Sequence, residues 1–266
     1  MSPLPTARPV VLVTGAARRM GRAMALDLAA HGFDVAVHYR GSKDDAFETV
    51  AELLCAGAQS HAFQADLSDE AACRALVPRV AAHFGRVDAV VNSASTFAYD
   101  DPLSFSVAAM EKHWRANTAP AILLAQALHA HLTGGSDDQA RRSGCVVNII
   151  DQKLWNPNPD YFSYTLSKAA LQAATVILAQ ALAPRVRVCG VAPGLTLMSG
   201  PMNAEEFAVA HKMTPLERAS TPDDIARAVR FLIESPAITG TTLLVDGGQH
   251  LSGQPRDVLY LARQQH

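Results

Sequence analysis

The sequence lacks most of the features that mark exported, membrane or nucleic-acid-binding proteins. Its four cysteines form no C-x-x-C pair and its ten histidines no H-E-x-x-H motif, so we expect neither a disulfide framework nor a metal site. Its 23 basic and 25 acidic side chains nearly cancel, which leaves no general attraction to nucleic acid or to an anionic membrane. No stretch reaches the roughly 18 consecutive apolar residues of a spanning helix, and the proline-broken start has no signal-peptide core. We expect a cytoplasmic protein.

The sequence does contain a regular alternation of short hydrophobic runs and helical segments. Helical patterns over residues 21–31, 44–56 and 69–84 follow the first three runs, and no repeat or linker divides the chain. Such an alternation is typical of a parallel sheet covered on both faces. We predict a single-domain Rossmann fold over residues 1–266, a doubly wound sheet of about seven strands with helices on both faces. The strand candidates are residues 9–17, 34–40, 60–66, 87–94, 145–150, 185–191 and 241–247.

Three segments fall outside this pattern. We expect a flexible tail at residues 1–8, a polar surface loop at 133–143, and a substrate lid at 194–220, where short elements are interrupted by glycine and proline.

A glycine-rich turn, TGAARRMG, follows the first strand. Gly15 permits the tight turn and Gly21 permits close packing of helix on strand, so that backbone N–H groups can face a pyrophosphate. A short glycine pattern also occurs in ordinary strand-to-helix turns. Its place in the first β-α-β unit favours a dinucleotide.

The end of the second strand predicts which dinucleotide is bound. A site for NAD usually has Asp or Glu there, whereas this chain has a basic segment, and Asp34 lies at the other end of the strand. Cations in this place fit the 2′-phosphate of NADP(H). The residues of the turn and of this segment that we predict to bind the cofactor are Arg18, Arg19, His38, Tyr39, Arg40 and Ser42.

Tyr164 and Lys168 are the candidates for the chemistry. They lie four residues apart in a long helical stretch and therefore on one face of it. A lysine ammonium beside a phenol favours the phenolate, so we expect the pKa of Tyr164 to be lowered from about 10. Such a tyrosine would act as a general acid near neutral pH.

These motifs together resemble the short-chain dehydrogenase/reductase family along almost the whole chain. The resemblance implies that Tyr164 donates a proton, that Lys168 binds the nicotinamide ribose and tunes Tyr164, and that Asn117 supports a proton-relay water. It also implies further cofactor contacts at Met20, Asp66, Leu67, Asn92, Ser93, Ala94, Pro193 and Gly194.

The departures from the usual family pattern form a pattern of their own. Asp151 stands where the family usually has a substrate-binding Ser, and Arg19 stands where it has its middle glycine. With Ser95 and Phe97 after the fourth strand, these departures resemble the pteridine reductases and the bacterial dihydromonapterin reductases. This resemblance implies that Phe97 stacks a pterin, that Ser95 and Arg19 contact pterin and cofactor phosphate, and that Asp151 assists Tyr164. Leu195, in the predicted lid, is the remaining substrate contact that we predict.

A carboxyl group suits this chemistry, because reduction of a C=N bond places a proton on nitrogen. We therefore expect an NADPH-dependent reductase that converts a dihydropterin to its tetrahydro form. A carbonyl or 3-oxoacyl reductase and a non-catalytic NADP-binding sensor remain alternatives. Asp151 could instead be a helix cap and Phe97 a core residue. The resemblance also suggests a homotetramer.

Overall fold

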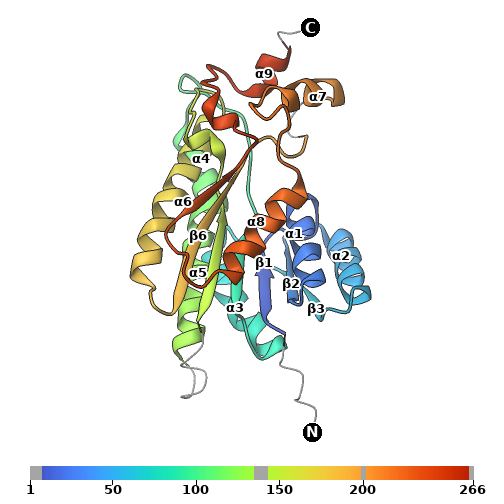
Figure 1. Ribbon diagram of the computed structural model, residues 1–266. Helices are drawn as coiled ribbons and strands as arrows, with labels where there is room; N and C mark the ends of the chain where they lie inside the picture. The colour runs from blue at the N-terminus through green and yellow to red at the C-terminus, as the bar shows by residue number, and fades with distance from the viewer. Residues whose placement is uncertain (1–7, 135–142, 199–201, 264–266) are drawn as a thin grey trace.

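The computed structural model describes residues 8–134, 143–198 and 202–263 (Figure 1). The predicted tail, except for residue 8, and residues 135–142 of the predicted loop lie outside this part. Seven strands form one sheet in the order β3-β2-β1-β4-β5-β6-β7, and every neighbouring pair is parallel. The fold prediction is confirmed. The strands are β1 Val10–Val13, β2 Asp34–Tyr39, β3 Ser60–Gln64, β4 Ala89–Asn92, β5 Gly144–Ile149, β6 Val186–Pro193 and β7 Thr242–Val245.

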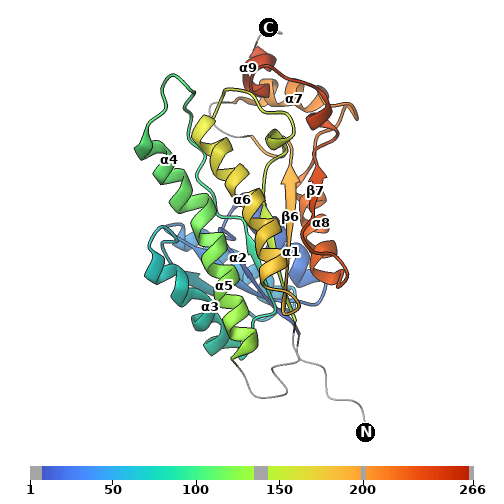
Figure 2. The ribbon, with the colours of Figure 1, turned by 90° about the vertical axis from the view of Figure 1, so that its left-hand side faces the viewer.

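Helices cover both faces of the sheet (Figures 1 and 2). Helices α1, α2 and α8 pack on one face of the sheet. Helices α3, α5 and α6 pack on the other. The three helices predicted from the pattern begin and end within two residues of their observed bounds. The bounds are α1 Arg19–Ala30, α2 Lys43–Cys55, α3 Glu70–Phe84, α4 Val107–His113, α5 Ala119–Thr133, α6 Phe162–Ala181, α7 Ala204–Lys212, α8 Pro222–Glu234 and α9 Val258–Arg263.

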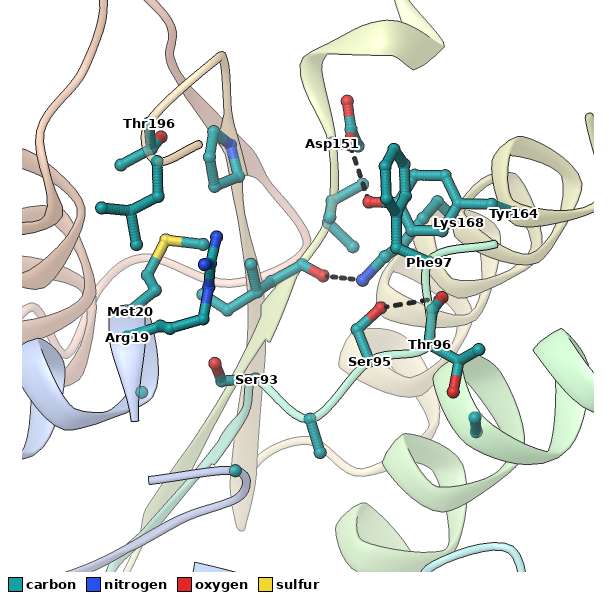
Figure 3. Close-up of a pocket in the computed structure, with 18 of the residues that line it drawn as sticks. Arg19, Met20, Ser93, Ser95, Thr96, Phe97, Asp151, Tyr164, Lys168 and Thr196 are labelled. Carbon is teal, nitrogen blue, oxygen red and sulfur yellow. Dashed lines mark hydrogen bonds between the residues drawn. The ribbon is translucent and has the colours of Figure 1, made fainter. Parts of the chain in front are cut away.

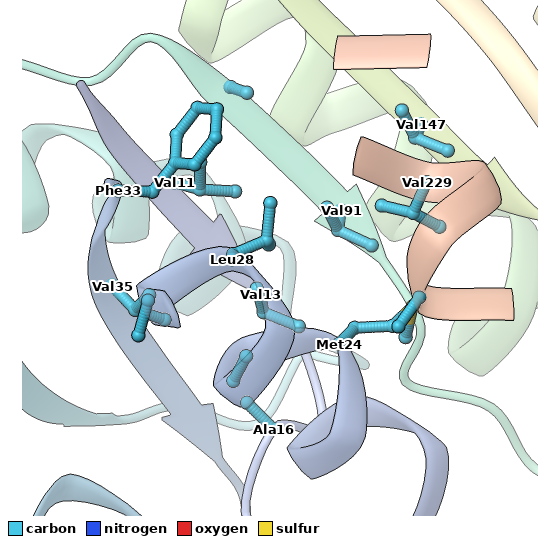
Figure 4. Packing of buried hydrophobic residues seen from close by; sticks show 14 of the residues in the cluster. Val11, Val13, Ala16, Met24, Leu28, Phe33, Val35, Val91, Val147 and Val229 are labelled. Carbon is cyan, nitrogen blue, oxygen red and sulfur yellow. The ribbon is translucent and has the colours of Figure 1, made fainter. Parts of the chain in front are cut away.

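Alternation along the strands divides the core into two large clusters. Successive side chains of a strand point to opposite faces of the sheet. In β1, Val11 and Val13 pack with Met24 of α1 (Figure 4), whereas Val10 and Leu12 pack on the other face beneath α3 and α5. Because both faces of the sheet are covered at its centre, β1 is apolar throughout rather than alternating, whereas the edge strand β3 is partly exposed.

The segment predicted as a lid contains helix α7. Asn203 and Glu206 form a capping box at its start, and the helix packs on α9. Met202, Ala210 and Leu259 belong to the small cluster between these helices, separate from the two sheet clusters. Residues 199–201 lie outside the described part, and the lid and the single-domain boundary stay predictions.

Within the described residues, no helix has the length and apolar character needed to span a membrane. The same residues contain no group of three or more His, Cys, Asp or Glu side chains arranged to hold a metal ion.

Candidate active site

A cavity of about 530 Å³ opens at the carboxyl ends of the strands (Figure 3). It begins at the turn after β1, where the strand order reverses between β1 and β4, and continues past the ends of β5 and β6. This switch point is where open α/β sheets usually bind ligands.

The glycine turn is tightly packed at its two ends, Gly15 and Gly21. Gly15 has φ +65°, and a Cβ added to Gly21 would lie 2.2 Å from the carbonyl oxygen of Gly15. No side chain fits there without moving backbone, so the close approach of helix to strand requires glycine. Arg19, in the place of the middle glycine, still has a positive φ of 54°. The turn therefore keeps the backbone shape of a glycine turn while it adds a guanidinium.

His38 lines the cavity, but as a buried neutral side chain. Its Nδ1 accepts the backbone N–H of Gly15 at 3.1 Å, and its Nε2 donates to the carbonyl of Ala65 at 3.1 Å. Burial lowers the pKa of His38 to about 4. His38, which we predicted as a cofactor contact, therefore reaches the cavity as a neutral imidazole that holds the glycine turn, and its contact with the cofactor stays a prediction.

The predicted arginines differ in their surroundings. Arg40 is exposed at the rim of the cavity. Arg18 is paired with Asp45 and is 60% exposed, whereas Arg19 donates to the carbonyl oxygen of Met198 at 2.6 Å. Arg19 thus links the glycine turn to the segment before α7.

Other predicted cofactor residues divide into two groups. Met20, Asp66, Leu67, Ser93, Ala94, Pro193 and Gly194 line the cavity. Tyr39, Ser42 and Asn92 are absent from its described lining: Asn92 donates to Asn148 at 2.8 Å inside the sheet, and Ser42 precedes α2 as its N-terminal cap residue.

Thr14 and Asn117 shape the loop after β4. Thr14 Oγ1 accepts the N–H groups of Ser93 and Ala94 at 2.9 and 3.0 Å. Asn117, in a π-helical turn over Trp114–Thr118, accepts the N–H of Thr96 at 2.7 Å and donates to its carbonyl at 3.0 Å. The side chain of Asn117 therefore braces this loop, and it is not part of the described lining of the cavity.

Asp151 and Tyr164 are bonded to each other. Tyr164 Oη donates to Asp151 Oδ2 at 2.7 Å, and Asp151 Oδ1 accepts the backbone N–H of Lys153 at 2.9 Å (Figure 3). Asp151 is thus both the cap of the short 3-10 helix η3 Gln152–Leu154 and the partner of the phenol. Lys168 Nζ donates to the carbonyl of Ile149 at 2.7 Å and lies 5.7 Å from the Tyr164 ring centroid.

The pKa of Tyr164 is shifted opposite to our expectation. Burial and the neighbouring Asp151 carboxylate raise it well above 10, because both disfavour the phenolate. Burial also raises the pKa of Asp151 and lowers that of Lys168 to about 8. The proton between Tyr164 and Asp151 consequently stays on the phenol at neutral pH.

Phe97 is a cavity residue rather than a core residue. It is 40% exposed, stacks on Tyr161 with centroids 4.0 Å apart, and meets Tyr164 edge-on at 4.7 Å. Ser95 and Leu195 also line the cavity, as predicted.

Sequence reasoning missed several lining residues at the end of the cavity away from the glycine turn. They come from η3, from the start of α6, from the segment between β6 and α7, and from the segment after β7, which no local motif connects. They include Gln152, Lys153, Tyr161, Thr196, Met202, Gln249, Asp257, Val258 and Leu259.

Comparison with known proteins shows the family of the chain. Residues 15–250 match the family model described as enoyl-(acyl carrier protein) reductase. The chain belongs to this family of oxidoreductases, the short-chain dehydrogenases/reductases.

Individual relatives connect the chain to two kinds of reductase. Pteridine reductase 1 of Leishmania tarentolae is 34% identical over 95% of this chain and 99% of its own length. The 3-oxoacyl-acyl-carrier-protein reductase FabG of Staphylococcus epidermidis is 33% identical over 90% of this chain and 98% of its own. The structure of FolM alternative dihydrofolate reductase 1 from Brucella suis in complex with NADP has a TM-score of 0.87 and 41% identity, covering 94% and 98% of the two chains. The resemblance to the pteridine reductase branch is confirmed.

Proposed function

We propose that the protein reduces a dihydropterin to its tetrahydro form with NADPH. The observation that carries the proposal is the hydrogen bond of 2.7 Å between Tyr164 and Asp151, placed beside Phe97 on the wall of the cavity. A carboxyl group there suits protonation of a ring nitrogen better than the hydroxyl that the family usually has.

The residues at the glycine turn fit NADP(H). Gly15 and Gly21 allow the tight turn and the close packing that bring the start of α1 to the cavity, where backbone N–H groups suit a pyrophosphate. The exposed Arg40 suits a 2′-phosphate. The Brucella suis relative is described in complex with NADP, which supports this assignment. Bound NADPH supplies the hydride.

The protein's own groups orient the substrate and provide its proton. The exposed face of Phe97 offers a flat apolar surface for a pterin ring. The hydroxyl of Tyr164, protonated at neutral pH, gives its proton to the ring nitrogen. The raised pKa of buried Asp151 suits its carboxylate to take up a proton from solvent and pass it to the phenolate that remains. The cation of Lys168, beside the phenol ring, favours the charge that develops on Tyr164 Oη.

The proposal is tested by measuring NADPH oxidation with dihydromonapterin and dihydrobiopterin beside a panel of ketones and 3-oxoacyl compounds. We expect turnover of the dihydropterins. The variant Asp151→Ser restores the usual family residue, and it should weaken pterin reduction more than NADPH binding. Turnover of ketones alone would disprove the proposal. If Asp151→Ser weakened pterin reduction and NADPH binding equally, Asp151 would have no specific role in pterin reduction.

The second candidate is a carbonyl or 3-oxoacyl reductase, which the 33% identity to FabG favours. The same panel of substrates separates it from the first. A non-catalytic NADP-binding sensor would bind NADPH, turn over no substrate and be unchanged by Tyr164→Phe.

We also propose a homotetramer in the cytoplasm. Sedimentation equilibrium of the purified protein measures the oligomeric state, and a monomer would contradict the first part of this proposal.

A further inference from the structure

The end of the cavity away from the glycine turn contains three polar side chains that the proposed chemistry does not use. Gln152 and Lys153 belong to η3, directly after Asp151, and Asp257 precedes α9. All three line the cavity. Asp257 is 104 residues from Lys153 in sequence, so the meeting of η3 with the segment before α9 is a result of the tertiary structure.

Gln152 is a buried side chain with an unused acceptor. The residue is 8% exposed, and its Oε1 has no hydrogen-bond partner among the described residues. A buried carbonyl oxygen without a donor is unfavourable, so one in a cavity wall indicates that a ligand supplies the donor.

Lys153, in contrast, has more N–H donors than its contacts with the described residues use. Its ammonium lies 3.2 Å from Asp257 Oδ2 and 5.4 Å from the ring centroid of Tyr161. An ammonium has three N–H donors, and these two contacts use no more than two of them. The side chain is buried, so a donor that faces the cavity gains from an acceptor on a ligand.

Asp257 is held in place by its own neighbours. Its Oδ1 accepts the N–H of Leu259 at 3.2 Å, and its backbone N–H donates to Asp160 Oδ2 at 2.7 Å. Asp160 is buried just before α6 and accepts two bonds from Arg256, both at 2.8 Å. The carboxylate of Asp257 is therefore held in a fixed position beside Lys153, where it compensates the charge of the ammonium.

We propose that Gln152, Lys153 and Asp257 form a subsite for a neutral, hydroxyl-bearing substituent on the substrate. A hydroxyl can donate to Gln152 Oε1 and at the same time accept from Lys153 Nζ, which satisfies both groups. A methyl group satisfies neither. A carboxylate offers nothing to Gln152 Oε1 and meets the like charge of Asp257. The inference rests on the proposed function and specifies which dihydropterins the site prefers.

The test compares three dihydropterins that differ only in their substituent: trihydroxypropyl, methyl, and the p-aminobenzoylglutamate of dihydrofolate. We expect kcat/KM for the hydroxylated compound to exceed that for each of the others by about tenfold to a hundredfold, the range of one or two hydrogen bonds to polar or charged groups. The preference should lie in KM rather than in kcat.

Gln152→Met removes the acceptor and keeps the length of the side chain. We expect the ratio of kcat/KM between hydroxylated and methyl compounds to fall about tenfold, while the melting temperature without substrate is not lowered. The matched control is Gln126→Met, an exposed change on α5, which should leave the ratio as it is. Lys153→Met should lower the ratio in the same direction.

Equal kcat/KM for the hydroxylated and methyl compounds in the wild type would overturn the subsite. So would an unchanged ratio in Gln152→Met, or a preference for dihydrofolate over both other compounds. If the wild type reduces none of the three, the proposed function itself fails and the subsite falls with it. These outcomes are distinct, because the first group requires a measurable rate.

Discussion

The two ends of the cavity are built in different ways. The glycine end is formed by short segments at the ends of β1, β2, β3 and β4, and it rests on the two large sheet clusters. The other end brings together η3, the start of α6 and the C-terminal segment, and part of it rests on the small cluster between α7 and α9. The first end is therefore fixed by local sequence and a deep core. The second depends on contacts between distant segments, and we expect it to determine which substrate is accepted.

The largest expected effect is a loss of kcat without a comparable loss of NADPH binding. Tyr164→Phe removes the phenol proton and leaves Asp151 Oδ2 without its donor, so kcat should fall by about 10² to 10⁴. The dissociation constant for NADPH, measured by fluorescence titration, should change little because the glycine end is intact. Tyr161→Phe keeps the stack on Phe97 and should lower kcat less than tenfold. A similar loss in both variants would show that Tyr164 has no special role.

The second effect compares the stability of the two ends. Met24 is fully buried in the core under α1, so Met24→Ala should lower the free energy of unfolding in urea by about 2 to 5 kcal/mol. Leu259→Ala lies in the small cluster, and its main effect should be faster hydrogen exchange in α7 and α9. An equal loss of global stability in the two variants would show that both ends unfold as one unit.

The third effect is a dependence of stability on pH. The folded protein has a pKa of about 8 at Lys168, whereas the unfolded chain has about 10.4. Between these values the unfolded state binds more protons, so stability rises with pH, by up to about 3 kcal/mol. Urea unfolding from pH 7.5 to 10.5 measures this rise, which should be absent from Lys168→Met. In the wild type, kcat/KM should fall above pH 8 as Lys168 loses its charge. An equal pH dependence in both proteins would contradict the shift.

The smallest expected effect concerns the choice of cofactor at the glycine end. Arg40→Ala should lower the preference for NADPH over NADH by about tenfold to a hundredfold, measured as the ratio of dissociation constants. Arg18→Ala should have a smaller effect, because Arg18 is exposed and already paired with Asp45. An unchanged ratio in Arg40→Ala would show that other residues select the cofactor.

Much of this structure could be predicted from the sequence. All seven strands and the pairing of Tyr164 with Lys168 on one helix face follow from hydrophobic periodicity and residue spacing. The pKa of Tyr164 could not be predicted, because Lys168 is bonded to Ile149 and the neighbouring charge that dominates is that of Asp151. The neutral state of His38 could not be predicted either, since it depends on the burial of the imidazole and on its two hydrogen bonds.

The sequence by itself determined the layered sheet, the glycine turn, and the presence of Asp151 in the place of the usual serine. These features depend on periodicity and on neighbours within a few residues, which a linear pattern records. Only the tertiary structure decided that Asp151 both caps η3 and binds Tyr164, and that Gln152, Lys153 and Asp257 meet at one end of the cavity. Burial and contact between segments far apart in the chain set these arrangements, and both depend on how the whole chain packs.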